Sequence, residues 1–189
     1  MLQNGSMMNK TGTSSSLWRW RERLVGELTG DVLEIGVGEG ANLRYYRQAQ
    51  RIWAIEPSAE RAHRARETAA TSPIPVTIDV TGAETLPYPD ATFDHVVSSL
   101  VFCSVNDQVQ VLREIRRVLK PSGTLHMVEH VRPQTHWVAA LFAAMTPRWR
   151  RIAHNCHLDR PTIEVLQREG WQVQIHRRVA MFVRVSATV

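Results

Sequence analysis

Hydrophobic and polar residues alternate with two different periods from residue 17 onward. Apolar residues recur every three or four positions over 17–28, 58–70 and 107–119, which predicts amphipathic helices. A further helix is expected over 161–169, because proline is tolerated at a helix start and Gly170 ends it. Shorter apolar runs predict strands at 32–35, 51–55, 76–80, 93–98 and 124–129, and a closing hairpin at 171–178 and 181–186.

Two further helical segments complete the pattern. One is expected over 41–48, directly after a glycine-rich turn, and the other is an insertion near 133–158 that contains a Trp-rich helix. Strands that alternate with helices predict a mostly parallel sheet covered on both faces, and the terminal hairpin adds an antiparallel edge. The sequence therefore predicts an α/β fold with a doubly wound, Rossmann-like sheet.

The length of 189 residues suits a single domain, which we place at 17–189. Residues 1–16 are polar and rich in Ser and Thr, so we expect a disordered tail there. The longest apolar run, 137–145, is far shorter than the roughly 20 residues that a membrane-spanning helix needs. Two cysteines make no disulfide framework, and the first residues lack the apolar stretch of a secretory signal, so a cytoplasmic location is expected.

Positive charge exceeds negative charge, with 23 Lys and Arg against 18 Asp and Glu and a formal net charge of +5. Most arginines fall on the outer faces of the predicted helices, as in a solvated surface, and nucleic acid is not expected as a partner. The exception is the segment 148–151, where three arginines surround Trp149 directly after the apolar run. This cluster is suited to a lipid headgroup or an anionic substrate, so peripheral membrane contact is one hypothesis.

The turn after the first strand has the chemistry of a ligand site. Gly36, Gly38 and Gly40 lie where a doubly wound sheet binds ligands, but the third glycine comes one residue too early for the dinucleotide fingerprint. Glu34 and Glu39 would repel a pyrophosphate, which favours a cationic or zwitterionic ligand. At the end of the second strand, the carboxylate of Glu56 is placed to accept both hydroxyls of a ribose.

Four motifs in order resemble those of the class I S-adenosylmethionine-dependent methyltransferases. They are 32–40, 55–57, 83–87 with 93–94, and 112–123. The resemblance implies a three-layer α/β/α fold with seven strands in the order 3-2-1-4-5-7-6, strand seven antiparallel. It also implies S-adenosyl-L-methionine as cofactor and a small-molecule methyl acceptor as partner.

The resemblance implies these cofactor-binding residues: Glu34, Gly36, Gly38, Gly40, Glu56, Pro57, Ala83, Glu84, Ser99 and Leu100. By this resemblance, the glycines let the backbone approach the methionine portion and the ribose, and Glu34 orders the turn and approaches the amino group. Glu56 holds the ribose, and Pro57 packs on the adenine.

The remaining implied contacts complete the two ends of the cofactor. Ala83 and Glu84 face the adenine edge, while Ser99 and Leu100 line the methionine side. Gly82 departs from the pattern, because many relatives have aspartate there to accept the adenine amino proton. Adenine recognition then depends on backbone groups or on Glu84.

Further segments resemble the thiol methyltransferases of the microsomal alkyl-thiol type and their bacterial relatives. These are 100–105, 129–131 and the residues Pro147, Trp149, Cys156, Leu158 and Arg160. This implies a small, partly apolar acceptor, with a thiol preferred. Quinone-ring C-methyltransferases and phospholipid N-methyltransferases share the four main motifs and remain alternatives, as does a non-enzymatic nucleotide-binding or membrane-surface module.

Methyl transfer from a sulfonium is an in-line displacement that proximity can largely accelerate, so a general base is optional. For a thiol acceptor, His130 and His157 are the candidate catalytic residues, since a histidine raises the thiolate fraction. Cys103 and Cys156 are interpreted as packing residues. No metal is expected, because the cluster 154–157 has no second ligand pair.

The substrate wall is expected from two apolar sets outside the nucleotide fold. They are Trp18 and Trp20 in the first helix, and Trp137, Leu141, Phe142, Met145 and Trp149 in the insertion. The same side chains would also serve to cover the sheet, so a packing role is the alternative.

Overall fold

A computed structural model describes residues 14–133, 135–152 and 155–189. The tail predicted at 1–16 lies mostly outside the described residues, and the first helix begins at Ser14. The helices are α1 (Ser14–Val25), α2 (Ala59–Ala69), α3 (Gln108–Val118), α4 (His136–Ile152) and α5 (Thr162–Arg168). The strands are β1 (Thr29–Ile35), β2 (Gln48–Ile55), β3 (Val76–Asp79), β4 (Phe93–Ser99), β5 (Leu119–His130), β6 (Gln172–Val179) and β7 (Phe182–Thr188).

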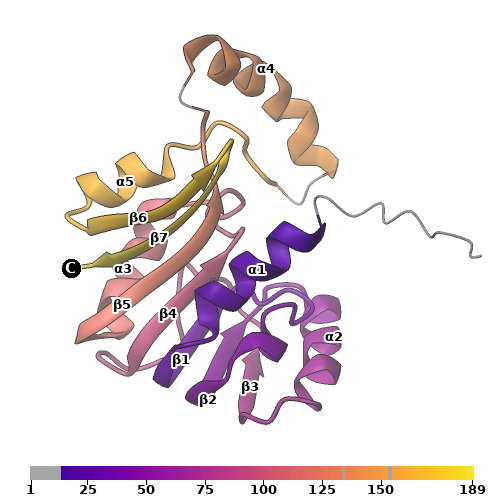
Figure 1. Ribbon diagram of the computed structural model, residues 1–189, viewed down its shortest axis with the longest axis vertical. Helices are drawn as coiled ribbons and strands as arrows, with labels where there is room; N and C mark the ends of the chain where they lie inside the picture. Colours follow the sequence, from indigo (N-terminus) through magenta and orange to yellow (C-terminus); the bar gives the residue numbers. More distant parts are fainter. Residues whose placement is uncertain (1–13, 134, 153–154) are drawn as a thin grey trace, which may run out of the picture.

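The seven strands form one sheet in the order β3-β2-β1-β4-β5-β7-β6. The first five strands run parallel to one another, and β7 is antiparallel to both β5 and β6. This confirms the predicted strand order and the position of the antiparallel strand. The carboxyl ends of β1, β2 and β4 consequently lie together at one edge of the sheet (Figure 1).

Successive strand residues point to opposite sides of the sheet. Both faces therefore carry apolar side chains, and helices cover both of them. Val32 and Val97 pack with α1 and α2, whereas their neighbours Leu33 and Val96 pack with α3 and α5. Two buried apolar clusters result, one on each face. The three-layer α/β/α architecture expected from the sequence is therefore present (Figure 1).

The helix predicted over 41–48 is wrong. Only a single 3₁₀ turn, η1 (Leu43–Tyr45), forms there, and β2 already begins at Gln48. The cause is the register of the parallel pair, which places Gln48 beside Thr29 at the start of β1. The chain must return along the whole of β1, about 20 Å at 3.3 Å per strand residue, and eight helical residues advance only about 12 Å.

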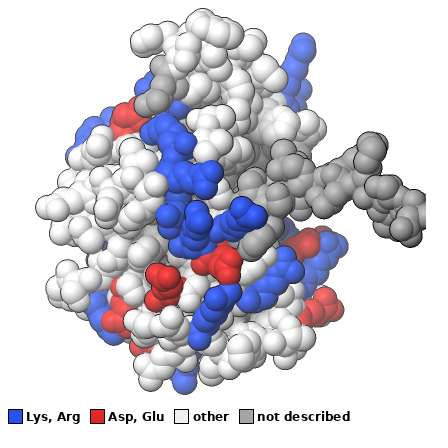
Figure 2. Space-filling view, viewed as in Figure 1, with Lys and Arg blue, Asp and Glu red and all other residues white. Residues whose placement is uncertain are grey.

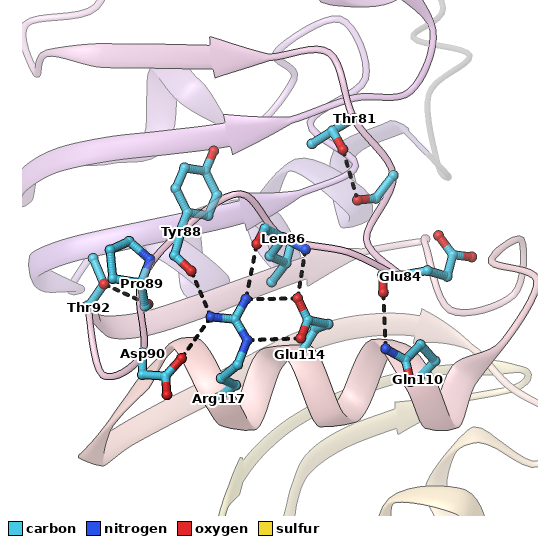
Figure 3. Close-up of polar contacts among 11 residues, drawn as sticks. Thr81, Glu84, Leu86, Tyr88, Pro89, Asp90, Thr92, Gln110, Glu114 and Arg117 are labelled. Atoms are coloured by element: carbon cyan, nitrogen blue, oxygen red, sulfur yellow. Dashed lines mark hydrogen bonds and ion pairs between the residues drawn. The ribbon is translucent and has the colours of Figure 1, made fainter.

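A polar network fixes the segment between β3 and β4 against α3 (Figure 3). The Arg117 guanidinium donates to both carboxylate oxygens of Glu114 at 2.9 and 2.8 Å, and to the carbonyl oxygens of Tyr88 and Leu86 at 2.7 and 3.0 Å. Glu114 also accepts from the Leu86 backbone N–H at 2.7 Å. The network explains why the motif 112–123 accompanies the motif 83–87, since the first holds the second in place.

The insertion forms α4, which follows the carboxyl end of β5 and stands above the sheet at the top of Figure 1. Of its described side chains only Thr146 is buried, and none belongs to either apolar cluster. Among the described residues, no helix is long and apolar enough to cross a membrane.

Candidate active site

One cavity of about 1380 Å³ lies at the carboxyl ends of β1, β2 and β4. It exceeds the roughly 300–1,000 Å³ typical of a site for one small ligand, so it has room for a methyl donor and an acceptor together. Most of the sequence-predicted site residues line it: Glu34, Gly36, Gly38, Glu56, Pro57, Ala83, Glu84, Ser99, Leu100 and His130. Gly40 and His157 do not.

The glycine turn brings bare backbone to the cavity. Gly36 and Gly38 both have φ of +61°, a conformation that side chains disfavour. A Cβ on Gly36 would lie 2.5 Å from Val101, and one on Gly38 would lie 2.7 Å from the Arg61 guanidinium. Gly40 has a different role, because its missing side chain allows close packing of Leu43 and the helix α2.

Glu56 joins the turn after β1 to the end of β2. Its side chain is buried, and its oxygens accept from the backbone N–H groups of Gly38 at 3.0 Å and Ser58 at 3.1 Å. Arg61 lies 3.7 Å away as a partly exposed cation. A carboxylate has about four lone-pair positions, so Glu56 retains acceptor capacity toward the cavity.

Glu34 is held by residues that the sequence reasoning missed. Its two oxygens accept from Asn42 at 2.8 Å and from the Tyr46 hydroxyl at 2.9 Å, and Asn42 in turn accepts from Arg21 of α1 at 2.7 Å. Burial raises the pKa of Glu34 to about 7, although both hydrogen bonds oppose the shift. The Glu34 carboxyl thus holds the segment that follows the glycine turn through Asn42 and Tyr46.

The negative charge of Glu39 acts on the cavity less strongly than its position in the turn predicts. Its carboxylate is exposed and pairs with Arg64 of α2 at 2.7 Å. Much of its charge is therefore offset before it acts on the cavity. Arg64 also lines the cavity and pairs with Glu60, so this rim carries both signs of charge.

The segment 82–84 also lines the cavity. One carboxylate oxygen of Glu84 accepts a hydrogen bond from the Asn106 N–H at 3.0 Å. The backbone carbonyl of Glu84 accepts a second one from the Gln110 side chain of α3 at 3.2 Å (Figure 3). Gly82 lines the cavity with no side chain to offer. At residue 82 the chain therefore presents only backbone to the cavity.

The loop after β4 shapes the acceptor end. Leu100 lines the cavity with φ of +61°, a strained conformation for a bulky residue that is characteristic of functional sites. Glu129 of β5 fixes this loop, because one of its carboxylate oxygens accepts hydrogen bonds from the Ser98 hydroxyl at 2.5 Å and from the Val101 N–H at 3.1 Å. Its other oxygen is buried without a hydrogen-bond partner among the described residues.

The two candidate catalytic histidines occupy different environments. His130 lines the cavity, and burial lowers its pKa, which keeps the ring neutral at pH 7. Its Nε2 lies 2.7 Å from the Met181 sulfur. His157 lies outside the cavity lining, and its Nδ1 accepts from Arg160 at 3.1 Å.

The expected apolar wall is only partly present. Phe142, Met145 and Trp149 of α4 line the cavity. Trp20 does not, because it packs in the cluster beneath α1, and α1 contributes Arg21 instead. The side chain of Trp18 lies outside what the structure describes.

Trp137 and Leu141 of α4 are exposed. Among the described residues, no group of three or more His, Cys, Asp or Glu side chains is arranged to hold a metal ion, and His154 lies outside them.

Burial raises the pKa of Glu129 to about 7, above the value of about 4.3 for a free glutamate. Between about pH 4.3 and 7, the folded state therefore keeps a proton on Glu129 that the unfolded state has released. The stabilisation that this proton contributes is lost as the pH rises to 7. Glu129→Gln keeps an acceptor for Ser98 and Val101 without the charge. The stability of the variant relative to the parent should increase between pH 5 and 7, by up to about 1.4 kcal/mol per pH unit, and should level off above pH 7.

Urea unfolding across this pH range measures the effect. Glu60→Gln, which changes an exposed carboxylate on α2, is the control and should show a flat difference. A flat difference for Glu129→Gln as well would show that this carboxyl titrates normally.

Residues 33–127 match the family of methyltransferase domains. The human thiol S-methyltransferase TMT1B is 31% identical over 160 residues, which cover 78% of this chain and 62% of the relative. The ubiquinone/menaquinone biosynthesis C-methyltransferase UbiE of Geobacter sulfurreducens is 30% identical, covering 66% of this chain and 53% of the relative. The chain thus spans between half and two thirds of these relatives.

Solved structures show the same fold. A crystal structure described as a putative S-adenosylmethionine-dependent methyltransferase from Listeria monocytogenes superposes with a TM-score of 0.71 at 16% identity, covering 93% of this chain and 99% of that one. At this identity the likeness concerns the fold alone. Together with the domain match over half of the chain, it confirms the family predicted from the four motifs: the chain belongs to the class I S-adenosylmethionine-dependent methyltransferases.

Proposed function

We propose that this enzyme transfers a methyl group from S-adenosyl-L-methionine to a small, partly apolar thiol. The observation that carries the proposal is that a single cavity joins two chemically different ends. One end presents the glycine turn and the carboxylates of Glu34 and Glu56, and the other is lined by apolar side chains of α4. A charged nucleoside donor and an apolar acceptor would meet between them.

The donor end fits the methyl donor residue by residue. Gly36 and Gly38 leave backbone open to the methionine portion, Glu56 retains lone pairs for the ribose hydroxyls, and Pro57 lies beside it for the adenine. The bound donor supplies a methyl group already activated on a sulfonium. The work of the chain is then to align the acceptor and exclude water, and alignment contributes up to roughly 7–11 kcal/mol.

His130 is the better placed of the two candidate bases. It lines the acceptor end and its ring is neutral, so it can accept the thiol proton as the acceptor reacts. His157 is a positioning residue in this proposal, since its backbone N–H donates to the Cys103 carbonyl at 2.8 Å beside the cavity. The thiol preference is supported by the likeness to the human thiol S-methyltransferase TMT1B.

A second candidate acceptor is a quinone-ring carbon, supported by the likeness to the C-methyltransferase UbiE and by the apolar wall. A phospholipid amine is the third. All three would require an acceptor with an apolar body. They differ in the atom that receives the methyl group, which product analysis distinguishes.

We also infer that the protein acts in the cytoplasm with α4 in contact with a membrane surface. α4 exposes a row of large apolar side chains, with Trp137 72% and Ile152 76% exposed. In Figure 2 the top of the molecule, where Figure 1 shows α4, is largely uncharged, and a band of Lys and Arg crosses the face below it. An apolar helix beside cations is typical of attachment to an anionic bilayer surface.

Substitution of Glu56 tests how the methyl donor is bound. Glu56→Ala removes charge-assisted hydrogen bonds to the ribose, worth about 1.5–3 kcal/mol each. Affinity for S-adenosyl-L-methionine should fall at least tenfold by titration calorimetry. Glu67→Ala, which removes an exposed carboxylate of α2 outside the cavity lining, should bind nearly as the parent does. Near-parental affinity of folded Glu56→Ala would mean that the ribose is held elsewhere.

The second prediction concerns the acceptor. Labelled donor is offered with alkyl thiols, quinol precursors and aminophospholipids, and alkyl thiols should be methylated fastest. His130→Asn should lower kcat for a thiol about tenfold to a hundredfold at pH 7, with recovery toward pH 9 as the free thiol ionises. Transfer to a quinol carbon alone would exclude the thiol, and an unchanged pH profile would exclude His130 as the base.

The third prediction concerns the membrane. The chain should co-sediment with phosphatidylserine-containing vesicles, and Trp137→Glu should weaken this at least tenfold, because a charge then opposes insertion of the apolar row. Ionic strength should weaken, without abolishing, binding by the parent. Arg113→Gln, an exposed change on α3 that lowers the net charge by the same one unit, is the charge-matched control. Equal binding of both variants would show that α4 is not the contact.

A further inference from the structure

The two cysteines of the chain meet at the acceptor end of the cavity. Cys103 comes from the loop after β4 and Cys156 from the segment between α4 and α5, and both line the cavity as free thiols. Each thiol is a neighbour that shifts the pKa of the other. The sequence contains no other cysteine, so all thiol chemistry of the protein resides in this pair.

Backbone contacts hold the two segments side by side. The His157 N–H donates to the Cys103 carbonyl at 2.8 Å, and the Asn155 side chain donates to the Ser104 carbonyl at 2.9 Å. Cys156 thus lies between two residues that are tied to Cys103 and its neighbour. A disulfide needs Cα atoms within roughly 4.4–6.8 Å, and these two hydrogen bonds hold the backbone on both sides of Cys156 against the loop that carries Cys103.

The two thiols differ in exposure and in surroundings. Cys156 is half-buried, and the neighbouring Cys103 thiol, the Trp149 side chain and the Arg160 cation together lower its pKa. Cys103 is only 3% exposed, and the neighbouring Cys156 thiol and burial raise its pKa, with Glu129 acting in the same direction. Cys156 therefore has the environment of an attacking thiolate, and Cys103 that of a thiol which reacts second.

We propose that Cys156 and Cys103 form a dithiol site that reduces small disulfides at the acceptor end of the methyltransferase cavity. The Cys156 thiolate attacks one sulfur of R–S–S–R, forms the Cys156–S–S–R bond and expels RS⁻. Cys103 then loses its proton to solvent and attacks the Cys156 sulfur, which forms the Cys103–Cys156 disulfide and expels the second RS⁻. Two electrons pass from the protein to the substrate, and an external dithiol reductant resets the pair.

This inference deepens the proposed function and rests on it, because each expelled thiolate is an acceptor of the proposed class, released beside the donor end. The cavity would then accept the oxidised form of its substrate as well as the reduced one. The chemistry of the exchange itself requires no methyl donor.

The test uses the reduced full-length chain and the neutral disulfide 4,4′-dithiodipyridine, without methyl donor. Released thiopyridone is counted by absorbance and the chain is weighed by intact mass spectrometry. The parent should release two thiopyridones and retain no adduct. Cys103→Ser should release one and keep a mixed disulfide on Cys156, while Cys156→Ser should react at least tenfold more slowly. The rate of the first step should rise with pH through a midpoint below the value of about 8.5 for a free cysteine.

Two adducts retained by the parent, or equal rates for the folded and urea-unfolded chain, would overturn the proposal. Cys103→Ala and circular dichroism guard against misfolding of the serine variant. Failure of the proposed function has a different signature, namely that a thiol supplied in reduced form is not methylated.

Discussion

The buried bond between Glu56 and the Gly38 N–H is the interaction on which the site depends. It ties the turn after β1 to the end of β2, and a second bond between the Val37 N–H and the Ile55 carbonyl, at 3.0 Å, reinforces it. Parallel strands end with unpaired backbone groups, and here one side chain satisfies two of the N–H groups. The turn after β1 and the end of β2 are consequently fixed to each other by contacts within the chain.

Elements with a clear local signal could be predicted from the sequence. The strand order and the antiparallel β7 followed from alternating elements and from the family motifs. The position of Glu56 beside the glycine turn followed from the rule that carboxyl ends of adjacent parallel strands meet. The helix at 41–48 was wrong because its position after the glycine-rich turn is a local signal, whereas the register of β2 against β1 decides how far the chain must travel.

Contacts between segments that are far apart in the sequence could not be predicted from local patterns. Asn42 and Tyr46 hold Glu34 across a turn that was expected to be helical, and Trp20 turned inward to the core. The two cysteines stand 53 positions apart by residue number, and each alone reads as a small apolar residue. Only the packing of the segment after α4 on the loop after β4 shows that they form a pair.

The detachment of α4 from the sheet has an evolutionary consequence. Its described side chains contribute nothing to the two apolar clusters, yet they form one wall of the cavity. Substitutions there can change which molecule is accepted while the free energy of unfolding stays almost constant. Selection can thus explore new acceptors in this helix without first acquiring compensating mutations in the core, so the fold can diversify its chemistry one side chain at a time.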